Sequence, residues 1–200
     1  MRWKVPFIPV LATLFVIGAI PAVAQVTRAG YQQHGPLVVG GGISDFSLDF
    51  GPSRRMLGVT AWADWNFRRL PSVFSGLGLE AEGRDINFNR PSSLTRMRQD
   101  TLLGGVIYTW RRYPRFQPYG KYLVGIGSID FPPFPGNPNY THDTRTVSAP
   151  GAGLDYRLWH KVSLRADYEY QFWHAIFGLN DLNPNGVTIG AVYDFGTPGR

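Results

Sequence analysis

Two pairs of carboxylates, each separated by a single residue, are the first candidates for chemistry in this chain of 200 residues. Glu80 and Glu82 form one pair, and Asp167 and Glu169 form the other. Close carboxylates can divide the roles of general acid and general base, because each shifts the proton affinity of the other. Basic side chains follow the same pattern, so a structural network of ion pairs is the favoured interpretation; these bases include Arg84, Lys121, Arg157 and Arg165.

His174 is the best candidate for a hydrolytic site. It ends a predicted strand, and a hydrolase would need a nucleophilic serine beside it and a carboxylate to orient it. No serine follows His174 in the chain, so Ser128 or Ser148 would have to reach it from another strand. We therefore predict that the chain is not an enzyme and that it has no catalytic residues.

The other histidines, His34, His142 and His160, are scattered along the chain. His142 is followed by Asp143, but two ligands fall short of the number that a zinc site requires. We expect solvated loop residues there, and neither a metal nor a cofactor. The basic residues do not form the stripe with stacking aromatics that nucleic-acid binding needs, although the formal net charge is +6.

The segments that carry these residues have the pattern of β-strands. Apolar and polar side chains alternate from Val162 to Phe172, and neighbouring side chains of a strand point to opposite faces. After residue 25 no segment shows a sustained 3.6-residue apolar period, so we predict an all-β fold. Gly40-Gly41-Gly42 interrupts the alternation of the first strand and leaves its register open. The eight expected strands lie at about 37–46, 55–67, 73–84, 101–111, 116–129, 145–157, 161–173 and 186–195.

An even number of such strands, apolar on one face, is typical of a closed antiparallel up-and-down transmembrane β-barrel. Arg or Lys on the lipid face would cost about 2–4 kcal/mol each near the bilayer midplane, so the charged face must point inward. Eight strands enclose just enough room for side chains. Six acids and five bases are expected to form a lumen charge network that plugs the barrel: Asp64, Glu80, Glu82, Arg84, Arg111, Lys121, Asp155, Arg157, Arg165, Asp167 and Glu169. The inward glycines are expected to leave room for these long side chains.

The first 24 residues have the features of a cleaved signal peptide, with Arg2 and Lys4 before an apolar run and small residues before Gln25. We predict export through the Sec pathway and cleavage between Ala24 and Gln25. A periplasmic lead-in at 25–36, the barrel at 37–195 and a short periplasmic tail at 196–200 would follow. The alternative is a retained membrane anchor, because the apolar run is nearly long enough to span a bilayer.

The predicted connections alternate in length, short at 68–71, 112–115 and 158–160 and long at 85–100, 130–144 and 174–185. Outer-membrane barrels turn their short connections to the periplasm and their long loops outward. The arginines of the 90–98 loop are suited to phosphates such as those of lipopolysaccharide. Aromatic residues near the short turns predict an interfacial girdle: Trp65, Phe67, Trp110, Tyr113, Tyr119, Tyr156, Trp159, Tyr193 and Phe195. A second band at the outer interface is expected from Tyr170, Phe172, Trp173 and Phe131.

Three segments carry a resemblance to a known family: Leu123–Gly127 (LVGIG), Gly151–Tyr156 (GAGLDY) and the closing Gly190–Phe195 (GAVYDF). With these motifs the chain resembles the porin-family and opacity-type outer-membrane β-barrel proteins, which include the barrel of outer membrane protein A. The resemblance implies a monomer in the bacterial outer membrane, surrounded by lipid and lipopolysaccharide. It also implies that the barrel-assembly machinery recognises the last strand.

The function expected from these observations is a structural, surface-exposed or adhesive role for a barrel with a plugged lumen. A narrow porin for ions or small solutes is the alternative, and it would require one sign of charge to dominate a cross-section of the lumen. A lipid A-modifying enzyme is the third hypothesis.

Overall fold

The computed structural model describes residues 36–49, 55–67, 70–89, 97–113, 115–133, 139, 141–176 and 180–196. These residues belong to one compact unit, which spans residues 31–200. The predicted signal peptide, its cleavage site at Ala24 and Gln25, nearly all of the lead-in and residues 197–200 lie outside the described residues. The same holds for residues 90–96 of the arginine-rich loop.

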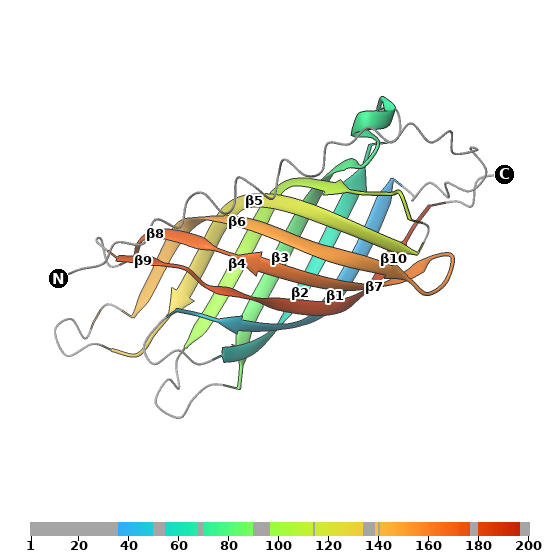
Figure 1. The fold of residues 1–200 in the computed structure, drawn as a ribbon. Coiled ribbons are helices and arrows are strands. Elements are labelled where there is room, and N and C mark those ends of the chain that lie inside the picture. The colour runs from blue at the N-terminus through green and yellow to red at the C-terminus, as the bar shows by residue number, and fades with distance from the viewer. Residues whose placement is uncertain are drawn as a thin grey trace, which may run out of the picture. The chain divides into compact units, whose positions relative to one another are not determined.

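Strands make up almost all of the described secondary structure (Figure 1). They are β1 (Leu37–Ser47), β2 (Arg55–Asn66), β3 (Leu77–Phe88), β4 (Arg98–Thr109), β5 (Phe116–Asp130), β6 (His142–Arg157), β7 (Val162–Tyr170), β8 (Phe172–Ile176), β9 (Asn180–Leu182) and β10 (Asn185–Asp194). A 3-10 helix, η1, covers Ser72–Phe74. Among the described residues, no helix has the length and apolar character that a membrane crossing requires.

The strands form one antiparallel sheet that closes on itself. The pairing order runs β5-β4-β3-β2-β1-β10-β7-β6, and β6 pairs with β5 to complete the ring. β8 continues the line of β7 along β6, and β9 continues the line of β10 along β8. Pro184 separates β9 from β10, and its carbonyl still accepts the backbone N–H of Gln171 at 2.7 Å. The prediction of an eight-stranded up-and-down barrel is therefore confirmed, with two of its strands interrupted.

Several strand boundaries differ from the prediction. The third strand begins at Leu77 and not at residue 73, because the backbone N–H of Phe74 bonds the carbonyl of Pro71 at 2.8 Å and closes a turn of η1. Val73, the first residue of the predicted strand, lies on this turn. At the end of the barrel with the long connections, the strands are longer than predicted. Pairs such as Asp85↔Asp100 and Asp130↔His142 extend the sheet into the predicted loops.

The barrel exterior is apolar, as the alternation predicted. Ile43 of β1 and Ile189 of β10 are cross-strand partners, and each is 65% exposed. This pair also establishes the register of β1, which the sequence had left open. The other exposed apolar side chains on the strands include Val59, Leu79, Leu102, Val106, Val124, Ile126, Leu164, Tyr168 and Val187.

The interior differs from a plug made of charges alone. Ion pairs occupy the middle of the lumen, but a cluster of buried apolar side chains fills the outer half. Its largest members are Trp173, Phe46, Phe131, Met56 and Met97. Trp173 and Phe131 were predicted in the outer aromatic band, and that prediction is wrong: both are buried inside the barrel. A smaller cluster of Val38, Trp62 and Val192 packs nearer the end with the short connections. We call it the periplasmic end, because outer-membrane barrels turn their short connections to the periplasm.

Several inward glycines make room for aromatic rings rather than for charged chains. A Cβ on Gly190 would collide with the Trp62 indole, and a Cβ on Gly127 would collide with Trp173. Gly151, beside the Lys121 side chain, does follow the expectation. The absence of side chains at these positions therefore lets the barrel hold large rings at full packing density.

Candidate functional site

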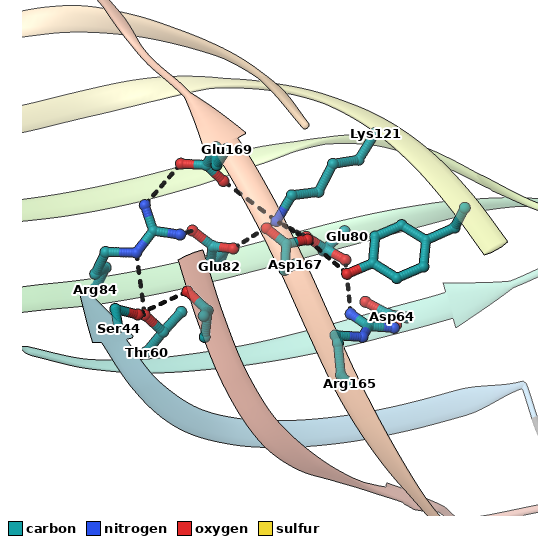
Figure 2. A network of polar contacts seen from close by, with 12 residues as sticks. Ser44, Thr60, Asp64, Glu80, Glu82, Arg84, Lys121, Arg165, Asp167 and Glu169 are labelled. Carbon is teal, nitrogen blue, oxygen red and sulfur yellow. Dashed lines mark hydrogen bonds and ion pairs between the residues drawn. The ribbon is translucent and has the colours of Figure 1, made fainter. Parts of the chain in front are cut away.

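The candidate site is the polar layer in the middle of the barrel interior (Figure 2). Alternation along each strand places its side chains on the inner face, where β2, β3, β5, β6 and β7 contribute charged groups. The layer lies between the outer apolar cluster and the periplasmic end. It therefore fills the lumen between the two apolar clusters.

Lys121 of β5 stands at the centre of this layer. Its Nζ lies 2.7 Å from Glu82, 3.0 Å from Glu80, and 3.2 Å from both Asp167 and Glu169. The two carboxylate pairs singled out in the sequence thus come from opposite sides, β3 and β7, and meet on one ammonium group. One ammonium group thus links four carboxylates from two strands.

Arg84 of β3 extends the layer toward the outer half. Its guanidinium donates to Glu82 at 2.6 Å, to Glu169 at 2.7 Å and to the Thr60 hydroxyl at 3.0 Å. The guanidinium carbon also lies 4.1 Å from the centre of the Phe46 ring, in a cation–π contact. Arg84 therefore links the ionic layer to the apolar cluster.

Arg165 of β7 anchors the periplasmic side of the layer. Its guanidinium donates to Asp64 at 2.7 Å, to Glu80 at 3.1 Å and to both Asp155 oxygens at 2.8 and 3.0 Å. The Tyr119 ring lies 4.7 Å from the guanidinium carbon. Tyr119 was predicted in the girdle, and that prediction is wrong: its ring is buried and its hydroxyl donates to Asp167 at 2.5 Å.

Arg111 and Arg157 lie beside this layer, nearer the periplasmic mouth, and Arg111 shares a cavity with Asp64, Asp155 and Arg165. Arg111 donates to Asn66 at 2.7 Å and lines a cavity of about 20 Å³, which is room for one water molecule. Arg157 ends β6, two residues beyond Asp155, and its backbone N–H bonds the carbonyl of Arg115 at 2.9 Å. Three of the five predicted interior bases therefore make the ionic layer.

Uncharged polar residues also belong to the layer, and the sequence interpretation missed them. Gln99 donates to Gln171 at 2.8 Å, and Gln171 donates to Glu169 at 2.8 Å. A second chain joins the Ser44 hydroxyl to those of Thr60 at 2.5 Å and Thr188 at 2.7 Å. Alternation in the sequence could have placed these residues inside the barrel. Each lies on the same face of its strand as the inward charged residues of that strand or of its neighbours.

The remaining girdle residues lie toward the periplasmic end. Trp65, Trp110, Tyr113, Trp159, Tyr193 and Phe195 are exposed, and Phe67 and Tyr156 are half-buried. Tyr193 and Phe195 meet edge to face with ring centres 4.9 Å apart, and Phe116 packs on Tyr156 at 5.0 Å. Amphipathic rings in such a belt suit a membrane interface.

The histidines at the outer rim differ from their predicted roles. His174 lies 3.6 Å from Asp181, and the contact between a serine and a histidine forms instead at His142. His142 Nδ1 is 2.6 Å from Asp130, and its Nε2 is 3.4 Å from the Ser128 hydroxyl and 3.2 Å from that of Thr144. His142 is exposed, as expected, but the pair begins β6 rather than lying in a loop. Asp143 is buried and pairs with Arg145 at 3.0 Å, so the prediction of a solvated residue is wrong there. No group of three or more His, Cys, Asp or Glu in the described ranges could hold a metal ion.

A closed barrel with an apolar exterior, an aromatic belt and a packed ionic interior is the architecture of small membrane-spanning β-barrel proteins. The model of the family described as outer membrane protein beta-barrel domain matches residues 10–195. The chain belongs to this family, which places it in the bacterial outer membrane and confirms the resemblance found in the sequence.

Solved structures of several outer-membrane proteins share the fold. Neisserial surface protein A matches with a TM-score of 0.62 and 13% identity, over 80% of this chain and 96% of that chain. The attachment invasion locus protein Ail of Yersinia pestis matches with a TM-score of 0.55 and 18% identity, over 81% and 99%. OprG of Pseudomonas aeruginosa matches with a TM-score of 0.52 and 16% identity, over 84% and 99%. No curated protein matches the chain.

Proposed function

We propose that this protein is a sealed outer-membrane barrel with a structural or adhesive role at the cell surface. The observation that carries the proposal is the continuous filling of the lumen. Trp173 and Phe131 belong to the apolar cluster of the outer half, and Lys121 joins four carboxylates below it. Conduction would require water and ions to displace these packed groups. The porin alternative is less well supported, because the described interior residues leave no continuous water-filled path.

The outer rim is the surface that such a barrel would present to partners. It carries exposed ion pairs, among them Arg55–Asp45 at 2.9 Å and Arg98–Asp100 at 3.0 Å. Groups of this kind bind charged partners in a salt-dependent way. A partner with both phosphates and cationic groups, such as the lipopolysaccharide layer, fits a rim that alternates in sign.

Single-channel recording tests the sealed lumen. The chain from Gln25 onward is refolded into a planar bilayer, and a heat-dependent gel shift confirms the barrel. We expect a folded protein without discrete current steps. Salt-dependent steps from the wild type would overturn the proposal and make the protein a small porin. A variant in which Lys121 and Arg84 are both replaced by Ser serves as the positive control, because it weakens the layer that blocks the lumen.

The surface role needs an assay of its own. Cells that produce the wild type are compared with cells that produce a variant in which Arg55 and Arg98 are replaced by Gln, at matched surface levels. We expect the variant to lose adhesion or binding to lipopolysaccharide vesicles, and the wild type to lose the same binding at high salt. Equal binding by both proteins would contradict the claim that the charged rim binds the partner.

A second candidate function is favoured by the contacts of His142. His142 contacts Asp130 through Nδ1 and Ser128 through Nε2, on the outer face of the barrel near its rim. Acyl-transfer enzymes use the same chain of acid, base and nucleophile. Ser128 would attack the carbonyl of a lipid acyl ester while His142 takes its proton and passes it to the leaving alkoxide; water would then release the fatty acid. We expect a fluorophosphonate probe to label the wild type and His174→Ala but not Ser128→Ala. An unlabelled wild type, or labelling of Ser128→Ala, would dismiss this candidate.

A further inference from the structure

The three short connections at the periplasmic end carry bases and no acid (Figure 1). They cover residues 67–76 between β2 and β3, 110–115 between β4 and β5, and 158–161 between β6 and β7. Their Arg and Lys residues are Arg68, Arg69, Arg111, Arg112, Arg115 and Lys161. Arg68 and Arg69 lie outside the described residues. Positive charge is therefore concentrated at this end of the barrel.

The β4–β5 and β6–β7 connections lie side by side. The backbone N–H of Arg157 donates to the carbonyl of Arg115 at 2.9 Å. The rings of Phe116 and Tyr156, which are cross-strand partners, pack with their centres 5.0 Å apart. The bases at this junction therefore form one segment of the rim, which we call the basic arc: Arg112, Arg115, Arg157 and Lys161.

The exposed arginines of the basic arc have no acidic partner among the described residues. Arg112 and Arg115 are both exposed, and neither forms an ion pair within the described ranges. Asp155, the acid next to the arc in the sequence, binds Arg165 at 2.8 Å instead.

The outer rim differs in this respect. Its described arginines already have acidic partners: Arg55 pairs with Asp45, Arg98 with Asp85 and Asp100, and Arg145 with Asp143. Exposed bases that the chain itself does not neutralise are therefore a property of the periplasmic end, and they suit an anionic partner there.

Exposed aromatic rings flank the same arginines. Trp110 and Tyr113 are 53% and 55% exposed, and Trp159 on the neighbouring connection is 68% exposed. Such rings lie at the headgroup level of a bilayer. They therefore place the guanidinium groups beside the lipid phosphates, whose oxygens accept the planar, forked donors of arginine.

We propose that the basic arc binds the phosphate groups of anionic phospholipids in the leaflet that surrounds the short connections. Two observations carry the proposal: exposed arginines without acidic partners, and exposed rings that fix their depth in the bilayer. A base near an anionic leaflet raises the affinity about fivefold, and salt screens this attraction. The arc lies at the opposite end from the outer rim, and its binding is independent of whether the lumen conducts.

Tryptophan quenching by brominated lipids tests the proposal. The chain from Gln25 onward, with Trp65→Phe, is refolded into phosphatidylcholine vesicles that contain a minority of phosphatidylglycerol. Bromine is carried by one lipid or by the other in matched sets. The exposed Trp110 and Trp159 then report the lipid beside the arc, since Trp62 and Trp173 are buried. We expect a preference for phosphatidylglycerol that high salt weakens. A protein without that preference would overturn the lipid assignment and favour an acidic periplasmic protein as the partner.

Arg112→Gln combined with Arg115→Gln provides the variant, because it removes two exposed charges and keeps polar side chains. We expect the preference to fall about fivefold for each arginine removed. Arg55→Gln combined with Arg98→Gln removes two charges from the outer rim and is the matched control, which should keep the wild-type preference. A heat-dependent gel shift confirms that each barrel is folded. A folded arc variant with the wild-type preference, or an equal loss in the control, would overturn the assignment to the basic arc.

Discussion

Replacement of Arg165 by Leu is the sharpest test of the ionic layer. The guanidinium donates four hydrogen bonds, to Asp64, Glu80 and both oxygens of Asp155. Leu keeps part of the contact with the Trp62 and Tyr119 rings but offers no donor. Three carboxylates would lose a charged partner at once.

The expected loss follows from the burial of these groups. Removing one partner of a buried ion pair costs about 3–5 kcal/mol, because the other charge stays in a medium of low dielectric. Arg165 has three such partners, so the loss should reach the upper part of that range. The matched control is Arg55→Leu, whose pair with Asp45 is exposed at the rim. Exposed pairs contribute about 0–1 kcal/mol.

Urea unfolding in detergent micelles measures both variants, with an unchanged m-value as evidence that the folded state is intact. A double variant, Arg165→Leu with Asp64→Asn, should recover part of the loss, because it removes one of the stranded charges. Equal stabilities of Arg165→Leu and Arg55→Leu would refute the reasoning. So would a double variant that is less stable than Arg165→Leu alone.

Three further predictions concern packing and polar contacts inside the barrel. Trp173→Ala should destabilise the barrel by about 3–5 kcal/mol in urea unfolding, because Trp173 is the largest buried side chain of the outer cluster; a loss below 1 kcal/mol would contradict that placement. Gly190→Val should prevent the heat-dependent gel shift, since its side chain would collide with Trp62 and with the backbone of β1, whereas Gly83→Val has open space and should fold. Tyr119→Phe should lose about 1.5–3 kcal/mol, as expected for a hydrogen bond to a charged group; an unchanged urea midpoint would contradict that contribution of the hydroxyl.

The aromatic residues show where the interpretation of the sequence failed and why. Tyr119 shares the phase of Lys121, Phe131 that of Ile129, and Trp173 that of Gln171. A strict use of alternation would have put all three rings inside. They were instead assigned by their position near strand ends, where aromatic residues of the membrane interface are common. Alternation along a strand therefore predicts the direction of an aromatic ring better than its nearness to the strand end does.

The sequence by itself determined the architecture, the face of the strands that lipid covers and the set of charges that must point inward. Those properties depend on the period of two, which is local and survives in a single strand. Only the tertiary structure decided which of those charges meet, that Arg111 and Arg157 stand apart from Lys121, and that half of the lumen is apolar. These outcomes depend on the stagger between strands when the barrel closes, and no single strand contains that information.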